Sequence, residues 1–145
     1  MRVIVQRVSG AKVEVEGKTT GSIDAGLLVL VGIKTSDNEK HASYMARKVW
    51  TMRIFSDEQG RMNRSVSDAG GSILTVPQFT LYGDTKKGSR PSFDQAAKPE
   101  MARELYNRFV SELQMLGAKV QTGVFQAHML VHLTNEGPVT LICEI

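Results

Sequence analysis

The first third of the chain carries the hydrophobic patterns of strands. From residue 12 to 16, apolar and charged positions alternate strictly, as in a strand with one face in a core. After a turn at Gly17, residues 19–23 can return as a hairpin partner. Residues 2–8 are rich in β-branched side chains and predict a short strand. Residues 27–33 are continuously apolar, which is typical of a strand buried on both faces.

Two segments show the three- and four-residue spacing of amphipathic helices. Ser36 with Glu39 forms a capping box, so the first helix is predicted to begin at Ser36. Its apolar stripe consists of Ala42, Met45, Ala46 and Val49. The second helix is predicted to begin at Pro99 and to end before Gly117. Its stripe consists of Ala102, Leu105, Tyr106, Phe109, Val110, Leu113 and Leu116.

Proline and glycine interrupt the remaining strands. Residues 72–81 resemble a strand, but Pro77 cannot donate to a ladder, so the strand must end, bulge or lie at an edge there. A long polar loop follows over residues 82–98. Further strands are predicted at 118–124, 129–135 and 139–145, with a turn between the last two. This order predicts a mixed α/β fold, with a β-rich sheet or partly closed barrel, two covering helices and three β/β/α layers.

Composition limits the class of protein. The 145 residues correspond to one domain, 1–145, and the 41% hydrophobic and 23% charged fractions exclude disordered, collagen-like and coiled-coil chains. A single cysteine, Cys143, excludes an intrachain disulfide and fits a reducing compartment, so a cytoplasmic location is expected. No membrane partner is expected, because the longest apolar run is far shorter than the ~20 residues of a span. The net charge of +3 permits a polyanionic partner without requiring one.

Common catalytic patterns are missing. The chain has no G-x-S-x-G motif and no evident Ser-His-Asp set. His128, His132 and Glu136 are spaced four apart, but they fall in strand-like sequence without H-E-x-x-H, so we interpret them as strand residues. Cys143 lies in an apolar strand and is interpreted as a small buried hydrophobe. The chain is therefore expected to use no metal and no cofactor.

A glycine-rich loop carries three cations, Lys86, Lys87 and Arg90. Gly83 and Gly88 have the interval of a phosphate-binding Walker A loop, but the Lys-Ser/Thr pair that must follow is absent. Flexible glycines beside three cations suit contacts with phosphates. A solvated surface loop explains the same composition, so both interpretations stay open at this point.

Two further segments are harder to explain by structure alone. In Pro77-Gln78-Phe79-Thr80-Leu81, polar and apolar residues alternate where proline breaks the ladder. Freed backbone N–H groups and a hydroxyl at such a break could stabilise an anion. The second segment, Asn135-Glu136-Gly137-Pro138-Val139-Thr140, sets Gly-Pro between two strands, which is usually a simple turn. The sequence does not decide whether that peptide is cis or trans.

At these two segments the chain resembles the D-aminoacyl-tRNA deacylases, also called D-tyrosyl-tRNA deacylases. The resemblance extends from Met1-Arg2-Val3-Ile4-Val5-Gln6-Arg7-Val8 to the final strand. Its most specific parts are Gln78-Phe79-Thr80-Leu81, Arg90-Pro91-Ser92-Phe93, Gln121-Thr122-Gly123 and Asn135-Glu136-Gly137-Pro138-Val139-Thr140.

The resemblance implies a homodimer with active sites at the subunit interface. It implies hydrolysis of the ester between a D-amino acid and the 3′ end of tRNA, with glycyl-tRNA as a second substrate and no cofactor. In the family the Gly-Pro peptide, here Gly137-Pro138, is cis, and it enters the partner's pocket and sterically excludes L-amino acids. Gln78, Phe79 and Thr80 would be the catalytic residues and form the pocket floor, and Pro77 and Asn135 would bind substrate together with the gate. The substrate's terminal 2′-hydroxyl would help to activate water.

The chain departs from the family at one position, because Pro77 stands where the family usually has serine. This removes a hydroxyl and a backbone N–H beside the pocket. An animal relative that edits an L-amino acid also has proline there, but it lacks the phenylalanine found here at Phe79. Pro77 therefore leaves a relaxed editor of L- or achiral aminoacyl-tRNA as an alternative to the D-specific enzyme, and the absence of a catalytic triad leaves a non-catalytic RNA-binding module as a second one.

Overall fold

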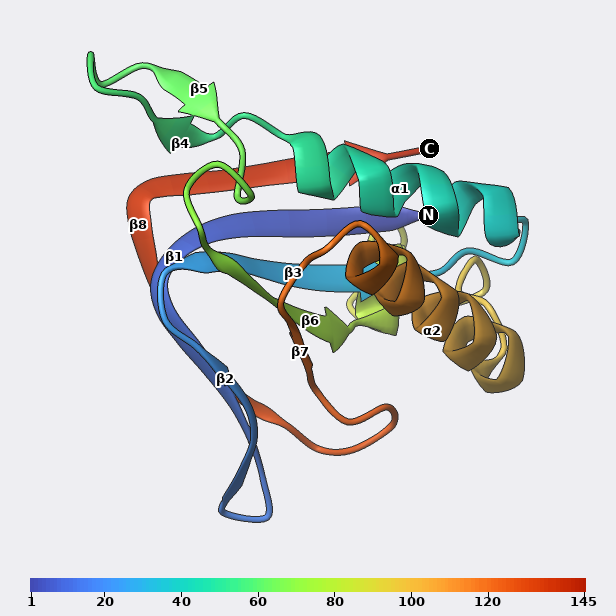
Figure 1. Ribbon diagram of the computed structural model, residues 1–145. Helices are drawn as coiled ribbons and strands as arrows, with labels where there is room; N and C mark the ends of the chain where they lie inside the picture. Colours follow the sequence, from blue (N-terminus) through green and yellow to red (C-terminus); the bar gives the residue numbers. More distant parts are fainter.

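The structure is a computed structural model that describes residues 1–145 (Figure 1). The strands are β1 (Arg2–Val15), β2 (Lys18–Ile23), β3 (Gly26–Gly32), β4 (Phe55–Ser56), β5 (Met62–Arg64), β6 (Ser72–Pro77), β7 (Val120–Thr122) and β8 (Leu130–Glu144). The helices are α1 (Glu39–Thr51), α2 (Pro99–Met115) and the one-turn 3-10 helix η1 (Phe79–Tyr82). No helix is both long and apolar enough to cross a membrane.

The sheet is built around β1, which is longer than the sequence predicts. Separate strands are expected at 2–8 and 12–16, but β1 continues through Gly10, which pairs with Thr134 of β8. The first half of β1 pairs antiparallel with β3 and its second half with β2, while β8 pairs along both halves. A single strand therefore joins two regions of sheet.

The sheet curls because β1 and β8 both bend midway (Figure 1). Its order is β2-β1-β3-β6-β7, with β8 on β1 and with β3, β6 and β7 parallel. The curl brings β2 against β7, where a Cβ added to Gly21 would lie 2.7 Å from the Thr122 carbonyl oxygen. Glycine permits this close approach of two backbones. The partly closed barrel expected from the sequence is confirmed.

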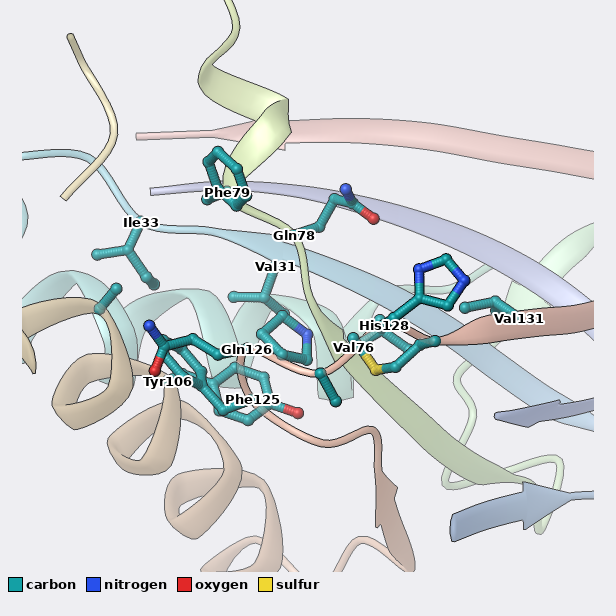
Figure 2. Close-up of a pocket in the computed structure, with 14 residues that line it drawn as sticks. Val31, Ile33, Val76, Gln78, Phe79, Tyr106, Phe125, Gln126, His128 and Val131 are labelled. Atoms are coloured by element: carbon teal, nitrogen blue, oxygen red, sulfur yellow. The ribbon is translucent and has the colours of Figure 1, made fainter. Parts of the chain in front are cut away.

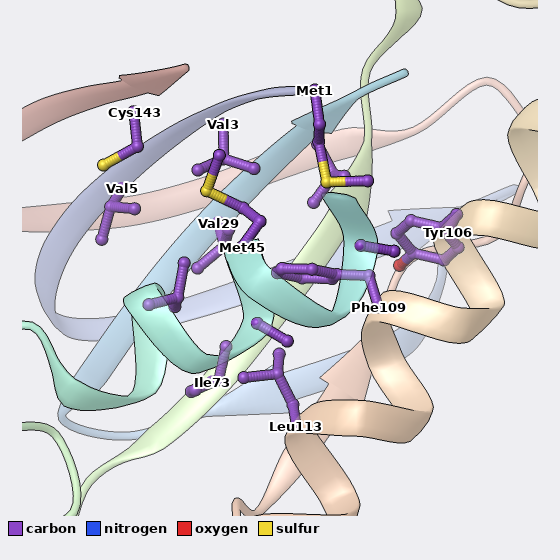
Figure 3. Close-up of a cluster of buried hydrophobic side chains, with 14 of the residues drawn as sticks. Met1, Val3, Val5, Val29, Met45, Ile73, Tyr106, Phe109, Leu113 and Cys143 are labelled. Carbon is purple, nitrogen blue, oxygen red and sulfur yellow. The ribbon is translucent and has the colours of Figure 1, made fainter. Parts of the chain in front are cut away.

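Both helices pack on one face of the sheet and bury the main core (Figure 3). α1 contributes Met45 and Val49, and α2 contributes Phe109 and Leu113, all with no exposed surface. These residues belong to the predicted stripes, since positions three and four apart share one face of a helix. Cys143 also lies in this core, as predicted, and burial raises the pKa of its thiol.

A second, smaller core fills the curled part of the sheet. It contains Val8 and Val13 of β1, Leu28 of β3, and Leu74 and Val76 of β6. Because β3 and β6 contribute side chains to both cores, they carry apolar residues at nearly every position, as a strand buried on both faces must. The main core lies between the helices and the central sheet, and the second core lies between the central sheet and the curled strands. The predicted α/β layering is therefore confirmed.

The start of α1 differs from the prediction. The N-cap is Asn38 rather than Ser36, and its side chain accepts the N–H groups of the first helical turn. Ser36 lies in the preceding turn, where the buried Asp37 carboxylate accepts a hydrogen bond from the Met1 amino group at 2.5 Å. That tertiary contact holds Asp37 outside the helix, so the next side chain able to cap is Asn38.

The predicted turn between the last two strands is wrong, because β8 passes through Gly137-Pro138 without reversing. Gln6 lies opposite Thr140, and Val8 lies opposite Asn135. β8 therefore takes five residue steps where β1 takes two, and the extra residues bulge outward. β1 supplies pairing partners on both sides of the bulge, which keeps the two halves of β8 in one strand.

The core predicts a sharp contrast between two substitutions on α2. Phe109→Ala removes a fully buried ring and should lower the free energy of unfolding by about 3–5 kcal/mol. Met115→Ala, on the same helix but 68% exposed, should change it by less than about 0.5 kcal/mol. Urea unfolding followed by circular dichroism measures both. Similar values for the two variants would contradict the core assignment.

Candidate active site

A mostly apolar cavity of about 440 Å³ opens beside the end of β6 (Figure 2). Its walls come from β3, the segment after β6, α2, the loop between β7 and β8, and β8 itself. The lining residues are Val31, Ile33, Val76, Pro77, Gln78, Phe79, Ala102, Tyr106, Phe125, Gln126, Ala127, His128, Met129 and Val131. Such a cavity, with few polar groups, has the size and character of a small-molecule site.

Pro77 ends β6 as the sequence predicts, and its ring lines the cavity. The Gln78 N–H donates to the Val31 carbonyl at 2.8 Å, and the Thr75 carbonyl accepts from Gly123 on the opposite side of the strand. Backbone groups alternate along a strand, so the Pro77 nitrogen faces the side of Thr75, beyond the last β7 pair. Proline at this position therefore costs the sheet no hydrogen bond.

The segment after Pro77 turns into η1 and carries the three residues predicted as catalytic. Gln78 and Phe79 line the cavity, whereas the neighbouring Thr80 does not line it and is exposed to solvent. The first hydrogen bond of η1 runs from Leu81 N–H to Gln78 O, so the N–H groups of Phe79 and Thr80 precede the bonded turn. The Gln78 amide donates to the Thr80 hydroxyl oxygen.

The far wall of the cavity is aromatic. The rings of Tyr106 and Phe125 lie 6.3 Å apart between centroids, on the side of α2 in Figure 2. The Tyr106 hydroxyl is buried and hydrogen-bonds both the carbonyl and the side chain of Thr75, at 3.0 and 2.8 Å. Burial raises the pKa of Tyr106 to about 12, with the Thr75 hydrogen bond acting in the opposite direction. Tyr106 thereby ties α2 to β6 beside the cavity.

The cationic loop extends from the other end of η1. Asp84 and Ser92 exchange two backbone hydrogen bonds, which close the loop into a hairpin-like arm. Lys86, Lys87 and Arg90 lie in this arm, are exposed, and form no ion pair with a carboxylate. Their charges are therefore available to an external anion.

The bulge of β8 holds Gly137 and Pro138 outside the cavity of their own chain. Both residues are exposed, neither lines the cavity, and the peptide bond between them is cis. Gly137 has a φ of +121°, and a Cβ there would lie 2.9 Å from an Arg7 nitrogen. Glycine is thus required at this position.

Two side chains fix the bulge. Arg7 on β1 donates to the carbonyls of Glu136 at 3.3 Å and Ile54 at 2.6 Å, which links the bulge to the segment before β4. Asn135 donates to the Thr140 hydroxyl at 2.7 Å and accepts the N–H that follows Pro138 at 3.2 Å. Asn135, predicted to bind substrate, therefore spans the base of the bulge rather than facing the cavity.

The histidines and Glu136 do not gather. His132 approaches Glu14 of β1 at 3.2 Å, His128 lines the cavity rim, and Glu136 lies near Arg7. No group of three or more His, Cys, Asp or Glu side chains is arranged to hold a metal ion.

Sequence reasoning missed several residues of the site. Tyr106 was expected only as part of a helix stripe, and Phe125 and Arg7 were not singled out. Tyr106 and Phe125 reach the cavity from segments far from Gln78 in sequence, and no local pattern signals that meeting. For Arg7, the only available signal is that it continues the odd-numbered positions of Val3 and Val5, where alternation predicts an apolar side chain.

Comparisons with known proteins agree with this geometry. The family model for D-Tyr-tRNA(Tyr) deacylase matches residues 4–144. A D-aminoacyl-tRNA deacylase of Heliobacterium modesticaldum is 56% identical over 144 residues, covering 99% of this chain and 96% of that protein. One of Koribacter versatilis is 55% identical over 144 residues, covering 99% and 97%. The solved structure of a c-Myc DNA Unwinding Element Binding Protein has a TM-score of 0.94 at 39% identity, covering 100% of this chain and 99% of that one.

The chain therefore belongs to the D-Tyr-tRNA(Tyr) deacylase family, as its sequence resemblance implies. It is accordingly a hydrolase of the class that acts on aminoacyl-tRNA.

The Tyr106–Thr75 contact predicts a stability effect with a distinct pH dependence. At pH 7, Tyr106→Phe should cost about 1–3 kcal/mol, because the buried Thr75 hydroxyl loses its partner and the Thr75 carbonyl keeps only its bond from Gly123. An unfolded tyrosine ionises near pH 10, whereas folded Tyr106 ionises at a pKa of about 12, so the wild type loses stability as pH rises from 10 to 12. The variant lacks this loss, so the difference in unfolding free energy between the two proteins should narrow as pH rises from 10 to 12. Urea unfolding at pH 7, 10 and 11 tests this, and a constant difference would contradict it.

Proposed function

We propose that this protein hydrolyses the ester that joins a D-amino acid, or glycine, to the 3′ end of tRNA, and that it rejects L-amino acids. One observation carries the proposal. An aromatic-walled cavity opens directly beside the Gln78-Phe79-Thr80 segment, in a chain of the deacylase family. tRNA substrates are cytoplasmic, so the protein acts in the cytoplasm.

The cavity suits the terminal adenosine of tRNA. A purine needs flat apolar walls, which Tyr106 and Phe125 provide, and base–aromatic stacking is a common means of binding single-stranded ends. With the base in this cavity, the ester would lie at its mouth, near the free N–H groups of Phe79 and Thr80. Those groups can donate to the oxyanion that develops on the ester carbonyl.

The catalytic contribution is positioning and polarisation rather than attack by a side chain. Thr80 is the obvious nucleophile by residue type, but its oxygen accepts a hydrogen bond from Gln78 and contacts no base. The Thr80 hydroxyl is therefore left to act as a hydrogen-bond donor. Water, assisted by the substrate's 2′-hydroxyl, attacks the ester. Oxyanion donors are worth about 10²–10³ in rate each, and correct positioning adds to this.

The exposed gate dipeptide, Gly137-Pro138, acts in the cavity of a second copy. The dipeptide is exposed and does not line the cavity of its own chain. A residue pair that selects substrates must contact a substrate, so this arrangement favours insertion into a partner's cavity. Arg7 and Asn135 hold the dipeptide rigidly, as a steric gate requires. An L side chain would meet the gate, whereas a D side chain or the hydrogen of glycine would point away.

The outer surface of β8 supports a homodimer. Its large apolar side chains include Leu130 at 53% exposure and Ile142 at 70%. β8 pairs only with β1, so its other edge carries unpaired backbone groups. Exposed apolar surface beside an unpaired edge is typical of an interface. We therefore propose that this surface joins two copies and brings each gate to the partner's cavity.

The cationic arm binds tRNA phosphates. Lys86, Lys87 and Arg90 are unpaired and follow η1, whose four residues span only about 8 Å at the rise of a 3-10 helix. Phe79 of the cavity wall packs edge-on against Phe93, the residue after the arm, with ring centroids 5.1 Å apart. A tRNA end that enters the cavity would therefore lie beside the arm.

A side-by-side assay tests the proposed activity. Purified protein should deacylate D-Tyr-tRNA and Gly-tRNA rapidly and leave L-Tyr-tRNA intact. Hydrolysis of all three substrates would favour a relaxed editor and point to Pro77. Binding of tRNA without hydrolysis would favour the RNA-binding module and contradict the proposal.

Pro138→Ala should open the gate. L-Tyr-tRNA hydrolysis should rise roughly tenfold or more, because about 1.4 kcal/mol of relieved clash corresponds to that factor. Gly-tRNA hydrolysis should change little, since glycine has no side chain to exclude. Thr134→Ala, an exposed position on β8 just before the bulge, is the matched control and should keep chiral discrimination. Unchanged discrimination in Pro138→Ala would remove the gate assignment.

Neutralising two cations of the arm should weaken tRNA binding and make that binding less dependent on salt concentration. In Lys86→Gln/Lys87→Gln the slope of log K against log salt should shrink by about 1.4–1.8, at roughly 0.7–0.9 per phosphate contact. Lys18→Gln/Lys40→Gln removes the same charge from other elements and should leave the slope unchanged. Equal slopes for wild type and the arm variant would show that the arm is only surface.

A further inference from the structure

We propose that Arg103 is a positioning residue that holds the β7–β8 loop as a wall of the substrate cavity. This inference rests on the proposed function, because it assigns the nucleobase of the substrate to that cavity. Arg103 itself does not line the cavity. It acts from behind the wall, on residues of the loop that do.

The loop between β7 and β8 has few bonds of its own to the rest of the protein. The Gly123 N–H donates to the Thr75 carbonyl at 2.8 Å and fixes its start, and a long 3.3 Å bond from Ala127 to Val124 closes a turn within it. Yet residues 125–129 all line the cavity. The shape of the cavity therefore depends on a segment that needs support from side chains.

Arg103 supplies that support through two contacts from α2. Its guanidinium carbon lies 4.6 Å from the centroid of the Phe125 ring, a cation–π arrangement. One of its terminal nitrogens donates to the Gln126 side-chain oxygen at 3.1 Å. A planar guanidinium can stack on a ring and donate from its edge at the same time, which a lysine ammonium cannot do. Arg103 pairs with no carboxylate that would compete for it.

Gln126 is the place where the loop most needs to be held. Its φ is +64°, in the left-handed region that side chains other than glycine seldom adopt. Such a residue stays in place only when its surroundings fix it. Arg103 bonds this residue and stacks on the preceding Phe125, whose ring faces Tyr106 across the cavity wall (Figure 2). Removing Arg103 should therefore loosen Phe125 and Gln126 together.

Kinetics of Gly-tRNA and D-Tyr-tRNA hydrolysis test the role. In Arg103→Ala, KM should rise roughly tenfold, the combined effect of one cation–π contact and one hydrogen bond, with kcat unchanged within about twofold. Arg103→Lys, which keeps the charge, should rescue little, because it cannot stack and donate together. Arg47→Ala on α1 removes an exposed arginine that is in no ion pair, and should leave KM unchanged.

Amide hydrogen exchange of the substrate-free protein separates this role from the alternatives. Within residues 124–128, the hydrogen-bonded Ala127 amide should exchange roughly tenfold faster in Arg103→Ala, because the contact no longer opposes local opening, while β6 and α2 keep their protection. A raised KM with unchanged exchange and a salt slope reduced by about 1 would make Arg103 a phosphate contact and overturn the proposal. Unchanged KM and unchanged exchange would also overturn it.

These readouts distinguish two failures. If the wild-type protein hydrolyses none of the aminoacyl-tRNAs, the proposed function fails, yet exchange at residues 124–128 still reports whether Arg103 holds the loop. If hydrolysis is normal but neither KM nor exchange responds to Arg103→Ala, the positioning role alone fails.

Discussion

The pairing of β1 with β8, interrupted opposite Arg7, is the constraint on which the rest of the structure depends. β1 carries β3 on its first half and β2 on its second, so its bend determines how far the sheet curls. β8 follows the same bend and accommodates it with a bulge. The Arg7 guanidinium donates to the Glu136 carbonyl, which the interrupted ladder leaves free, and also to the Ile54 carbonyl before β4. These two bonds hold the bulge rigidly.

The cavity arises where several elements end, and this explains its chemistry. β6 stops at Pro77 just beyond the last pair of β7, so backbone groups near the cavity mouth are free of the sheet. Around them lie apolar and aromatic walls with few charged groups. A cavity of this kind favours holding and orienting a bound molecule over attack by a charged side chain.

Much of the fold was predictable, because periodicity reports directly on burial. The helix stripes predicted Met45, Val49, Phe109 and Leu113 as core residues, and they are fully buried. The Pro77 break was also predictable, since a missing N–H limits where a strand can continue. The helix start at Ser36 failed because Asp37 makes a tertiary contact, and the predicted turn at Gly137-Pro138 failed because β1 pairs on both sides of it. Local rules do not include either partner.

The sequence by itself determined the two helices, the strand character of most of the remaining chain and the family resemblance. Only the tertiary structure decided that Tyr106 and Phe125 lie in one cavity with Gln78, that Asn135 spans a bulge, and that Gly137-Pro138 lies outside the cavity of its own chain. The physical reason is that hydrophobic pattern specifies which face of an element is buried. Which elements meet, and in what register, depends on long-range pairing that no local pattern records.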